Sequence, residues 1–275
     1  MGKGPLFCVS ALLAVFIVPI PALRAQSFMQ QSRDAVEARF RDCPRKNGDR
    51  QKKLEEMFRI AGCTGDQLTE QPVKGKREPN VVCTLRGETD SVIIVGAHFD
   101  NDGRGRGVID NWSGASLLPT LYQSLKKQSH KHTIVFIGFT AEEDGLVGSR
   151  FYARHMTREQ IQKTRAMIDI DCLGLSTTAV EMNRGDKTLL DMLKRTAAAM
   201  KLPIRGVNVD KVGMSDGESF AAVKIPRITF HSLTQDTLRD INSSFDQFNV
   251  VRWDDYYDSY MLIAGFLAFC DMILD

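Results

Sequence analysis

The sequence lacks an excess of either charge. Its 275 residues include 36 Lys and Arg against 34 Asp and Glu, a formal net charge of +2. Lys3 and Arg24 account for that excess and lie in an N-terminal stretch without acids, so the rest of the chain is neutral. A neutral chain without a basic stripe argues against nucleic acid or an anionic membrane surface as a partner.

Long apolar runs are also scarce. The apolar run over residues 6–18 is too short for a membrane-spanning helix, and Pro19 and Pro21 prevent its continuation. A lysine before this run and a small residue, Ala25, after it are typical of a signal peptide. We therefore predict that residues 1–25 are a signal peptide, and that the mature protein is secreted or periplasmic without a stable membrane anchor. The alternative is an uncleaved anchor.

Cysteines are few, and their spacing matches no zinc-knuckle pattern. Removal of residues 1–25 would leave an odd number, so at least one thiol stays free; the remaining cysteines are Cys43, Cys63, Cys83, Cys172 and Cys270. Export permits disulfides. Cys63 ends a helical pattern and Cys83 lies in the strand-like "NVVCTL", so a Cys63–Cys83 bridge is the pairing we favour, although sequence alone does not fix connectivity.

The sequence has no repeat, no long linker and no change of composition after residue 80. Two helical stretches precede that point, and strand-like and helical patterns alternate beyond it. The strand-like runs are Val81–Leu85, Ser91–Ala97, Thr133–Thr140, Ala166–Asp171 and Arg227–His231. The helical patterns are Ser113–Lys127, Gly148–His155, Lys187–Lys201, Gly217–Val223 and an amphipathic Trp253–Leu274. This order predicts an α/β fold with a mainly parallel sheet, as one domain over residues 26–275 whose segment 26–61 is helical.

Titratable residues lie in or just after several of the predicted strands. They are His98, Glu142, Glu143, Asp169, Asp171 and His231, and Asp110 lies just before a helix. The carboxyl ends of parallel strands form one edge of a sheet, where ligands bind in such folds. We therefore expect these side chains to converge on one crevice.

Each of these residues also has an ordinary structural interpretation. A single histidine is most often a hydrogen-bonded structural residue, and an Asp before a helix is usually an N-cap. Together, however, they place several carboxylates at one edge with few nearby Lys or Arg residues, and a divalent cation would neutralise them. One imidazole with mixed carboxylates suits zinc. Asp100, two residues after His98, can accept a hydrogen bond from the second ring nitrogen and orient the ligand.

Five motifs in this order resemble the zinc aminopeptidase/carboxypeptidase family typified by bacterial leucyl aminopeptidases. They are "VGAHFDN", "GVIDNWSGAS", "FTAEEDGLVGSRFYA", "IDIDCLG" and "GMSDGESFAAVKIPRITF". The family includes glutamate carboxypeptidases and is related to glutaminyl cyclases. The resemblance covers residues 80–274 and implies a three-layer α/β/α sandwich with a mixed, mainly parallel central sheet.

The resemblance also implies residue roles. His98 and Asp171 match ligands of one zinc, Asp110 matches the carboxylate that bridges two zincs, and Glu143 matches a ligand of the other. Asp169 is then a neighbour of the site. The peptide bond after Asp110 is cis in the family. Glu142 matches the general base, which would take a proton from a zinc-activated water and return it to the leaving amine.

The last zinc ligand of the family is a histidine, and this chain has Asn242 at that position in "NSSFD". Amide oxygen is a weaker zinc donor than imidazole, so the second of two expected zinc sites would be weak or empty. His231 could substitute, although it matches a strand end. Gly217 is a further departure, because relatives carry a histidine there.

Three functions remain open. The first is an exopeptidase, by family frequency an aminopeptidase, that acts on peptide or small-molecule substrates. The second is a single-zinc acyltransferase similar to glutaminyl cyclase, and the third is a non-catalytic peptide-binding relative. A two-metal phosphoesterase would need arginines or phosphate-binding glycine loops near the ligands, and "NDGRGRG" is a poor candidate. We expect His130, His132 and His155 to be solvated surface residues.

Overall fold

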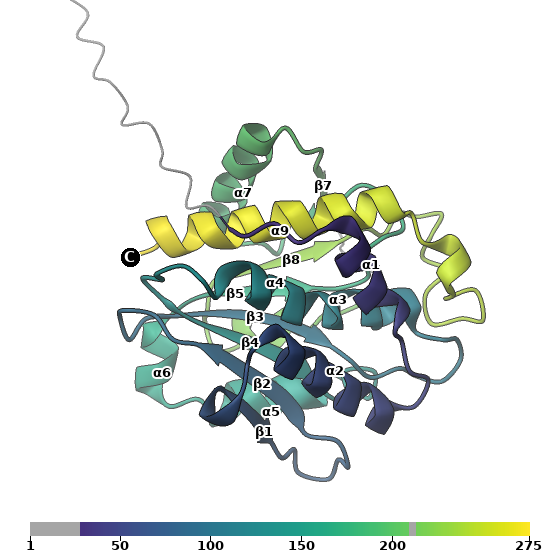
Figure 1. Cartoon of the computed structure of the whole chain (residues 1–275), viewed down its shortest axis with the longest axis horizontal. Helices are drawn as coiled ribbons and strands as arrows, with labels where there is room; N and C mark the ends of the chain where they lie inside the picture. The colour runs from purple at the N-terminus through teal and green to yellow at the C-terminus, as the bar shows by residue number, and fades with distance from the viewer. Residues whose placement is uncertain (1–27, 209–212) are drawn as a thin grey trace, which may run out of the picture.

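The computed structural model describes residues 28–208 and 213–275, which fold around an eight-stranded mixed sheet (Figure 1). The predicted signal peptide, residues 1–25, lies outside the described residues. Across the sheet the strand order is β1-β2-β4-β3-β5-β8-β6-β7. Their bounds are Leu68–Gln71 (β1), Asn80–Leu85 (β2), Val92–His98 (β3), Thr133–Phe139 (β4), Thr164–Ile170 (β5), Ala179–Glu181 (β6), Arg205–Val207 (β7) and Arg227–His231 (β8).

Four neighbouring strands, β4, β3, β5 and β8, are parallel and form the centre of the sheet. Strands β2 and β6 run antiparallel to their inner neighbours, which makes the sheet mixed as expected. The central strands read as continuous apolar runs because both of their faces are buried. In β4, for example, Phe136 packs into the core on one face and Ile137 into the core on the other.

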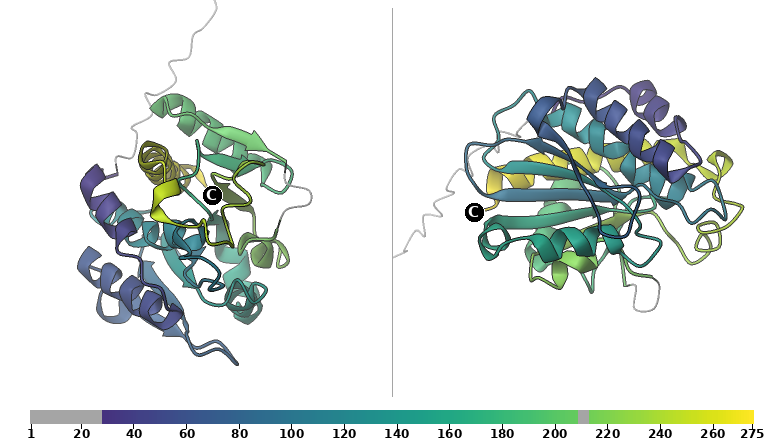
Figure 2. Two further views of the ribbon diagram at one scale, coloured as in Figure 1. Left: turned by 90° about the vertical axis from the view of Figure 1, so that its right-hand side faces the viewer. Right: turned by 90° about the horizontal axis from the view of Figure 1, so that it is seen from below.

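Helices cover both faces of the sheet, which gives three layers (Figure 2). The larger core packs under α1 (Arg33–Arg41), α2 (Asn47–Ala61), α4 (Leu117–Leu125), α7 (Lys187–Met200) and α9 (Trp253–Ile273). The smaller core on the opposite face packs under α5 (Val147–His155), α6 (Arg158–Lys163) and α8 (Gly217–Ala221). The α/β/α sandwich predicted from the resemblance is therefore confirmed. No helix in the described part of the chain has the length and apolarity that a membrane span requires.

The C-terminal helix differs from its prediction. We expected α9 to be amphipathic, but it is buried around most of its circumference because α1, α4 and α7 all pack against it. A second prediction is also wrong, because His130 and His132 are buried next to Asp271 of α9 rather than solvated. Asp271 pairs with the His130 ring and accepts from the His132 backbone N–H, at 3.1 and 2.8 Å. His155 is exposed, as expected.

Cysteine pairing agrees with the sequence-based preference. A disulfide joins Cys63, just after α2, to Cys83 in β2. Cys43, Cys172 and Cys270 are free and buried. The bridge therefore fastens the N-terminal helical segment to β2, the second strand from one edge of the sheet.

Candidate functional site

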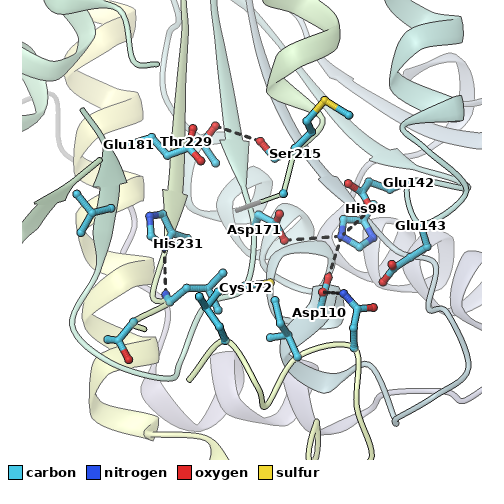
Figure 3. A pocket seen from close by; sticks show the side chains of 18 of the residues that line it. His98, Asp110, Glu142, Glu143, Asp171, Cys172, Glu181, Ser215, Thr229 and His231 are labelled. Carbon is cyan, nitrogen blue, oxygen red and sulfur yellow. Dashed lines mark hydrogen bonds and ion pairs between the residues drawn. The ribbon is translucent and has the colours of Figure 1, made fainter. Parts of the chain in front are cut away.

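The predicted site residues converge at the carboxyl ends of β3, β4, β5 and β8. They lie on the sheet face that α5, α6 and α8 cover. Side chains alternate along a strand, so His98 points to the same face as Ile94, and Asp171 to the same face as Met167. Ile94 and Met167 both pack into the smaller core on that face. A cavity of about 790 Å³ lies at these strand ends, beyond the N-terminus of α8, where Met214 and Ser215 line it (Figure 3). His98, Asp110, Glu142, Glu143, Asp171, His231 and Asn242 all line it.

Three of the predicted ligands form a compact cluster. One ligand atom from each of His98, Asp110 and Asp171 lies within 4.8 Å of the others. The His98 Nε2 atom is 3.1 Å from Asp110 Oδ1 and 3.7 Å from Asp171 Oδ1, so this nitrogen points into the cluster (Figure 3). Asp171 Oδ1 is buried and has no hydrogen-bond partner among the described residues. One imidazole nitrogen and two carboxylates, one with an unpartnered oxygen, are a donor set that fits zinc.

Asp100 connects the histidine to the two glutamates. Its Oδ1 lies 3.5 Å from His98 Nδ1, which leaves Nε2 of the imidazole for the cluster. The same carboxylate accepts from the backbone N–H groups of Glu142 and Glu143 at 3.0 and 3.2 Å. One buried aspartate thus holds the turn after β4 and lies beside the His98 ring.

Asp110 lies in η2 (Val108–Trp112), and the peptide bond between Asp110 and Asn111 is cis, as the resemblance implied. Asp246 holds this turn by accepting from the Ile109 and Asp110 N–H groups at 2.7 and 3.1 Å. Asn111 donates to the Ile170 carbonyl at 2.8 Å, which ties the turn to the end of β5. Asp246 is the aspartate of the "NSSFD" motif, whose sequence alone gives it no role.

Arg50 is a second residue that sequence reasoning missed. Its side chain is fully buried in the larger core, where burial lowers its pKa. The guanidinium donates to five backbone carbonyls, those of Pro44, Phe99, Asp100, Arg106 and Gly107, at 2.6–3.4 Å. It therefore ties α2 to the loop between His98 and Asp110. A basic residue inside an ordinary amphipathic helix gives no sequence signal for this role.

The electrostatics of the site favour a bound cation. Burial raises the pKa of Glu142 to about 10, and Asp216, Asp171 and Asp110 contribute to the same shift. Burial and Asp110 raise the pKa of Glu143 to about 8. Burial lowers the pKa of His98, but the surrounding carboxylates outweigh it and hold that pKa well above the usual range. One imidazolium is too little charge for this number of acids, and a divalent cation relieves the repulsion.

Asn242 lies beside the cluster with its amide directed at a carboxylate. Its Nδ2 donates to Asp110 Oδ2 at 3.0 Å, whereas His98 lies against the other oxygen of that carboxylate. Asn242 has φ of +52°, a left-handed conformation that asparagine tolerates. Glu143 Oε1 is buried without a partner among the described residues. The second site therefore has carboxylate oxygens and an N–H donor, but no imidazole at position 242.

His231 lines the cavity but lies away from the second site, because Figure 3 shows it across the cavity from Glu143. The structure also shows what a histidine at Gly217 would meet. A Cβ on Gly217 would meet Asp169 Oδ2 at 3.1 Å and Thr229 Oγ1 at 3.2 Å, so a larger side chain needs its neighbours to move. Gly217 instead donates its N–H to Asp169 at 3.1 Å. Asp169 also accepts from the Thr229 hydroxyl, so it lies beside the cluster, as expected.

An α/β/α sandwich with these side chains at its strand ends has the arrangement of a metal-dependent hydrolase. A model of peptidase family M28 matches residues 80–267, and the chain belongs to that family. The probable leucine aminopeptidase 2 of Trichophyton verrucosum is 32% identical over 114 residues, which cover 41% of this chain and 23% of that relative. The chain thus spans less than a quarter of that relative's length.

Two solved structures show the fold. The LapA aminopeptidase of Legionella pneumophila is 23% identical with a TM-score of 0.76, and the match covers 88% of this chain and 71% of LapA. BSAP, a zinc aminopeptidase from Bacillus subtilis, is 20% identical with a TM-score of 0.63 over 69% of this chain and 49% of BSAP. These two matches show the fold, and the predicted family is confirmed by the family model that matches residues 80–267.

Proposed function

We propose that this protein is a zinc-dependent aminopeptidase that removes N-terminal residues from peptides. The observation that carries the proposal is the compact cluster of His98, Asp110 and Asp171, with Glu142 Oε2 only 3.9 Å from His98 Nε2. BSAP, which shares the fold, is a zinc aminopeptidase, and the donor set here suits the same metal.

Glu142 is the group we assign to proton transfer. When bound, zinc supplies Lewis acidity and lowers the pKa of water so that it becomes a nucleophile near neutral pH. The Glu142 carboxylate would accept the proton of the attacking water and donate it to the nitrogen of the leaving amine as the C–N bond breaks. Asp100 supports this step, because its bond to the Glu142 N–H fixes the start of the turn.

The charge of the cavity favours an aminopeptidase over a carboxypeptidase. Among the described residues that line it, Arg205 is the only Lys or Arg. Its Nη2 is already engaged by the Ser176 hydroxyl and the Thr177 and Leu233 carbonyls, at 2.8, 3.3 and 3.4 Å. Part of the Arg205 guanidinium is therefore committed to the fold, whereas the acidic cluster can attract a terminal ammonium group.

We further propose that one zinc is held tightly, by His98, Asp110 and Asp171. Glu143 would contribute to a second, weaker site. The Asn242 amide donates to the Asp110 oxygen that faces this second site. The hydrogen bond from Asn242 would thus partly stabilise the negative charge of Asp110, which a second cation would otherwise neutralise.

The proposal is tested by hydrolysis of aminoacyl p-nitroanilides, with zinc content measured on the same samples. We expect Glu142→Ala to retain zinc and to lose at least about 100-fold in kcat, the usual scale of general acid–base catalysis. Glu78→Ala is the matched control, because Glu78 lies away from the cavity. Unchanged hydrolysis in Glu142→Ala would exclude this residue as the base.

The same assays separate the alternatives. Release of C-terminal residues from N-terminally blocked peptides, without hydrolysis of aminoacyl p-nitroanilides, would indicate a carboxypeptidase. Cyclisation of N-terminal glutamine without peptide hydrolysis would indicate an acyltransferase, and neither reaction in zinc-replete protein would indicate a binding relative. Export is a separate proposal, tested by N-terminal sequencing of the mature protein, which we expect to begin at Gln26.

A further inference from the structure

The cavity has a second polar end, away from the metal cluster. Glu181, the last residue of β6, and His231, the last residue of β8, both line it. Figure 3 shows them across the cavity from His98, Glu142 and Glu143. Ala179 pairs with His231 in the antiparallel register, so Glu181, two residues further along β6, lies diagonally from His231 on the same face. Such diagonal neighbours are roughly 7–8 Å apart.

His231 is a hydrogen-bond donor without an acceptor. Its Nδ1 accepts from the Leu233 N–H at 3.1 Å, which assigns the ring proton to Nε2. Nε2 has no partner among the described residues, and the side chain is only 7% exposed. Burial, reinforced by Arg205, lowers the pKa of His231 to about 4, so the ring is neutral. An unpaired buried N–H of this kind costs free energy until an acceptor arrives.

Glu181 is the complementary acceptor. Its Oε2 is buried and unpartnered among the described residues. Arg184 and Arg227 lie 3.9 and 3.8 Å from its carboxylate, too far for hydrogen bonds but close enough to balance its charge. Both arginines also pair with Glu218, at 3.5 and 2.7 Å.

This balance restricts the charge of any occupant. Two glutamates and two arginines balance when both glutamates are ionised. Burial raises the pKa of Glu181 to about 7, so this balance holds above that pH. A cationic side chain would add unbalanced charge beside Arg184 and Arg227, and an anionic one would do so beside Glu181. An apolar side chain would leave both the His231 donor and the Glu181 acceptor unpaired.

We propose that this end of the cavity is a subsite for a neutral carboxamide side chain, asparagine or glutamine, on the N-terminal residue of the substrate. Its carbonyl accepts from His231 Nε2–H, and its NH₂ group donates to Glu181. A carboxamide carries an acceptor oxygen and an NH₂ donor on one planar group, so it can pair with both side chains. The inference rests on the proposed aminopeptidase function and assigns its substrate class.

The test uses zinc-replete protein and fluorogenic aminoacyl amides of Gln, Asn, Leu, Lys and Glu, with amine release as the signal. We expect kcat/KM for Gln or Asn to exceed that for Leu by about tenfold or more, and Lys and Glu to be poorer than either amide. His231→Phe and Glu181→Leu should each reduce the amide-to-Leu ratio about tenfold, the scale of one hydrogen bond. Part of this change should be a rise in kcat/KM for Leu, because one polar group fewer is then left unpaired beside its side chain. Glu181→Gln should preserve most of the ratio, because its side-chain oxygen still accepts.

His155→Phe is the matched control, since His155 is exposed and remote from the cavity. Thermal unfolding checks that each variant folds. If one of His231→Phe and Glu181→Leu does not fold, the other still tests the subsite. A wild-type preference for Leu, Lys or Glu over both amides, or an equal loss on all substrates in the variants, would overturn the subsite and leave the aminopeptidase proposal standing. Absence of hydrolysis with every substrate would overturn both.

Discussion

At the scale of single residues, the site is a set of acids that needs a positive charge. The sequence indicated its members because carboxylates are costly at the end of a buried strand, and Asp110, Glu142, Glu143 and Asp171 do line one cavity. Asp246, Arg50 and Glu181 were not predicted. Their roles depend on backbone groups and arginines that tertiary folding brings to them from distant parts of the chain.

Asn242 gives the first residue-scale prediction. Asn242→His should raise the zinc content from about one to about two ions per chain, because imidazole is a stronger zinc donor than an amide. Metal analysis after dialysis against buffer containing micromolar zinc measures the ratio. Ser243→His places the same imidazole one residue away and should leave the ratio near one. An unchanged ratio in Asn242→His would show that position 242 does not contribute to a second site.

Arg50 gives the second. Arg50→Met should lower the free energy of unfolding by about 3 kcal/mol or more, because five backbone carbonyls lose their buried donor. Zinc affinity should fall as well, since the loop between His98 and Asp110 loses its anchor. Urea denaturation and zinc titration measure the two effects, and Arg45→Met, on the exposed surface, is the control. Wild-type zinc affinity in folded Arg50→Met would refute the positioning role.

At the scale of elements, the sequence predicted the parallel core well and the edges poorly. The central strands are apolar on both faces, so their pattern is strong, and β3, β4, β5 and β8 were all expected close to where they lie. Strands β1, β6 and β7 were missed. They have three or four residues each, and their conformation comes from pairing with neighbours, not from a periodic pattern.

The loop before β4 and helix α9 provide a pH-dependent prediction. His130 Nδ1 lies 3.1 Å from Asp271 Oδ2, and its Nε2 lies 2.8 Å from the Leu125 carbonyl. Both partners are acceptors, which favours the imidazolium. Burial lowers the pKa of His130, but the bonds to Asp271 and Leu125 outweigh it, so the net pKa is raised.

Because the pKa of His130 is raised in the folded state, protonation of His130 stabilises the fold. This stabilisation is fully present below the unfolded-state pKa of about 6.5, and it is lost as the pH rises through the folded-state pKa. Zinc-replete wild type should therefore lose more stability between pH 6 and pH 8 than His130→Asn does. Urea denaturation at the two pH values measures the difference. Identical losses in the two proteins would exclude His130 as a source of the pH dependence.

At the scale of the whole molecule, the disulfide connects the N-terminal helices to the sheet. It spans a sequence separation of 20 residues. Replacing both Cys63 and Cys83 by alanine should cost about 3 kcal/mol in the free energy of unfolding, as expected for a loop of this size. Reduction should destabilise the wild type by a similar amount and leave the double variant unchanged. If reduction affects both proteins equally, the effect does not come from this bridge.

The whole site is explained by one requirement, that a bound cation holds its acids together at the end of the sheet. The most direct test is elemental analysis of purified protein after dialysis against zinc-containing and then zinc-free buffer, with Asp171→Asn alongside. We predict about one tightly held zinc ion per wild-type chain, lost in Asp171→Asn together with the gain in thermal stability that zinc provides. A wild-type protein that retains no transition metal, or an Asp171→Asn variant that retains it fully, would contradict the account.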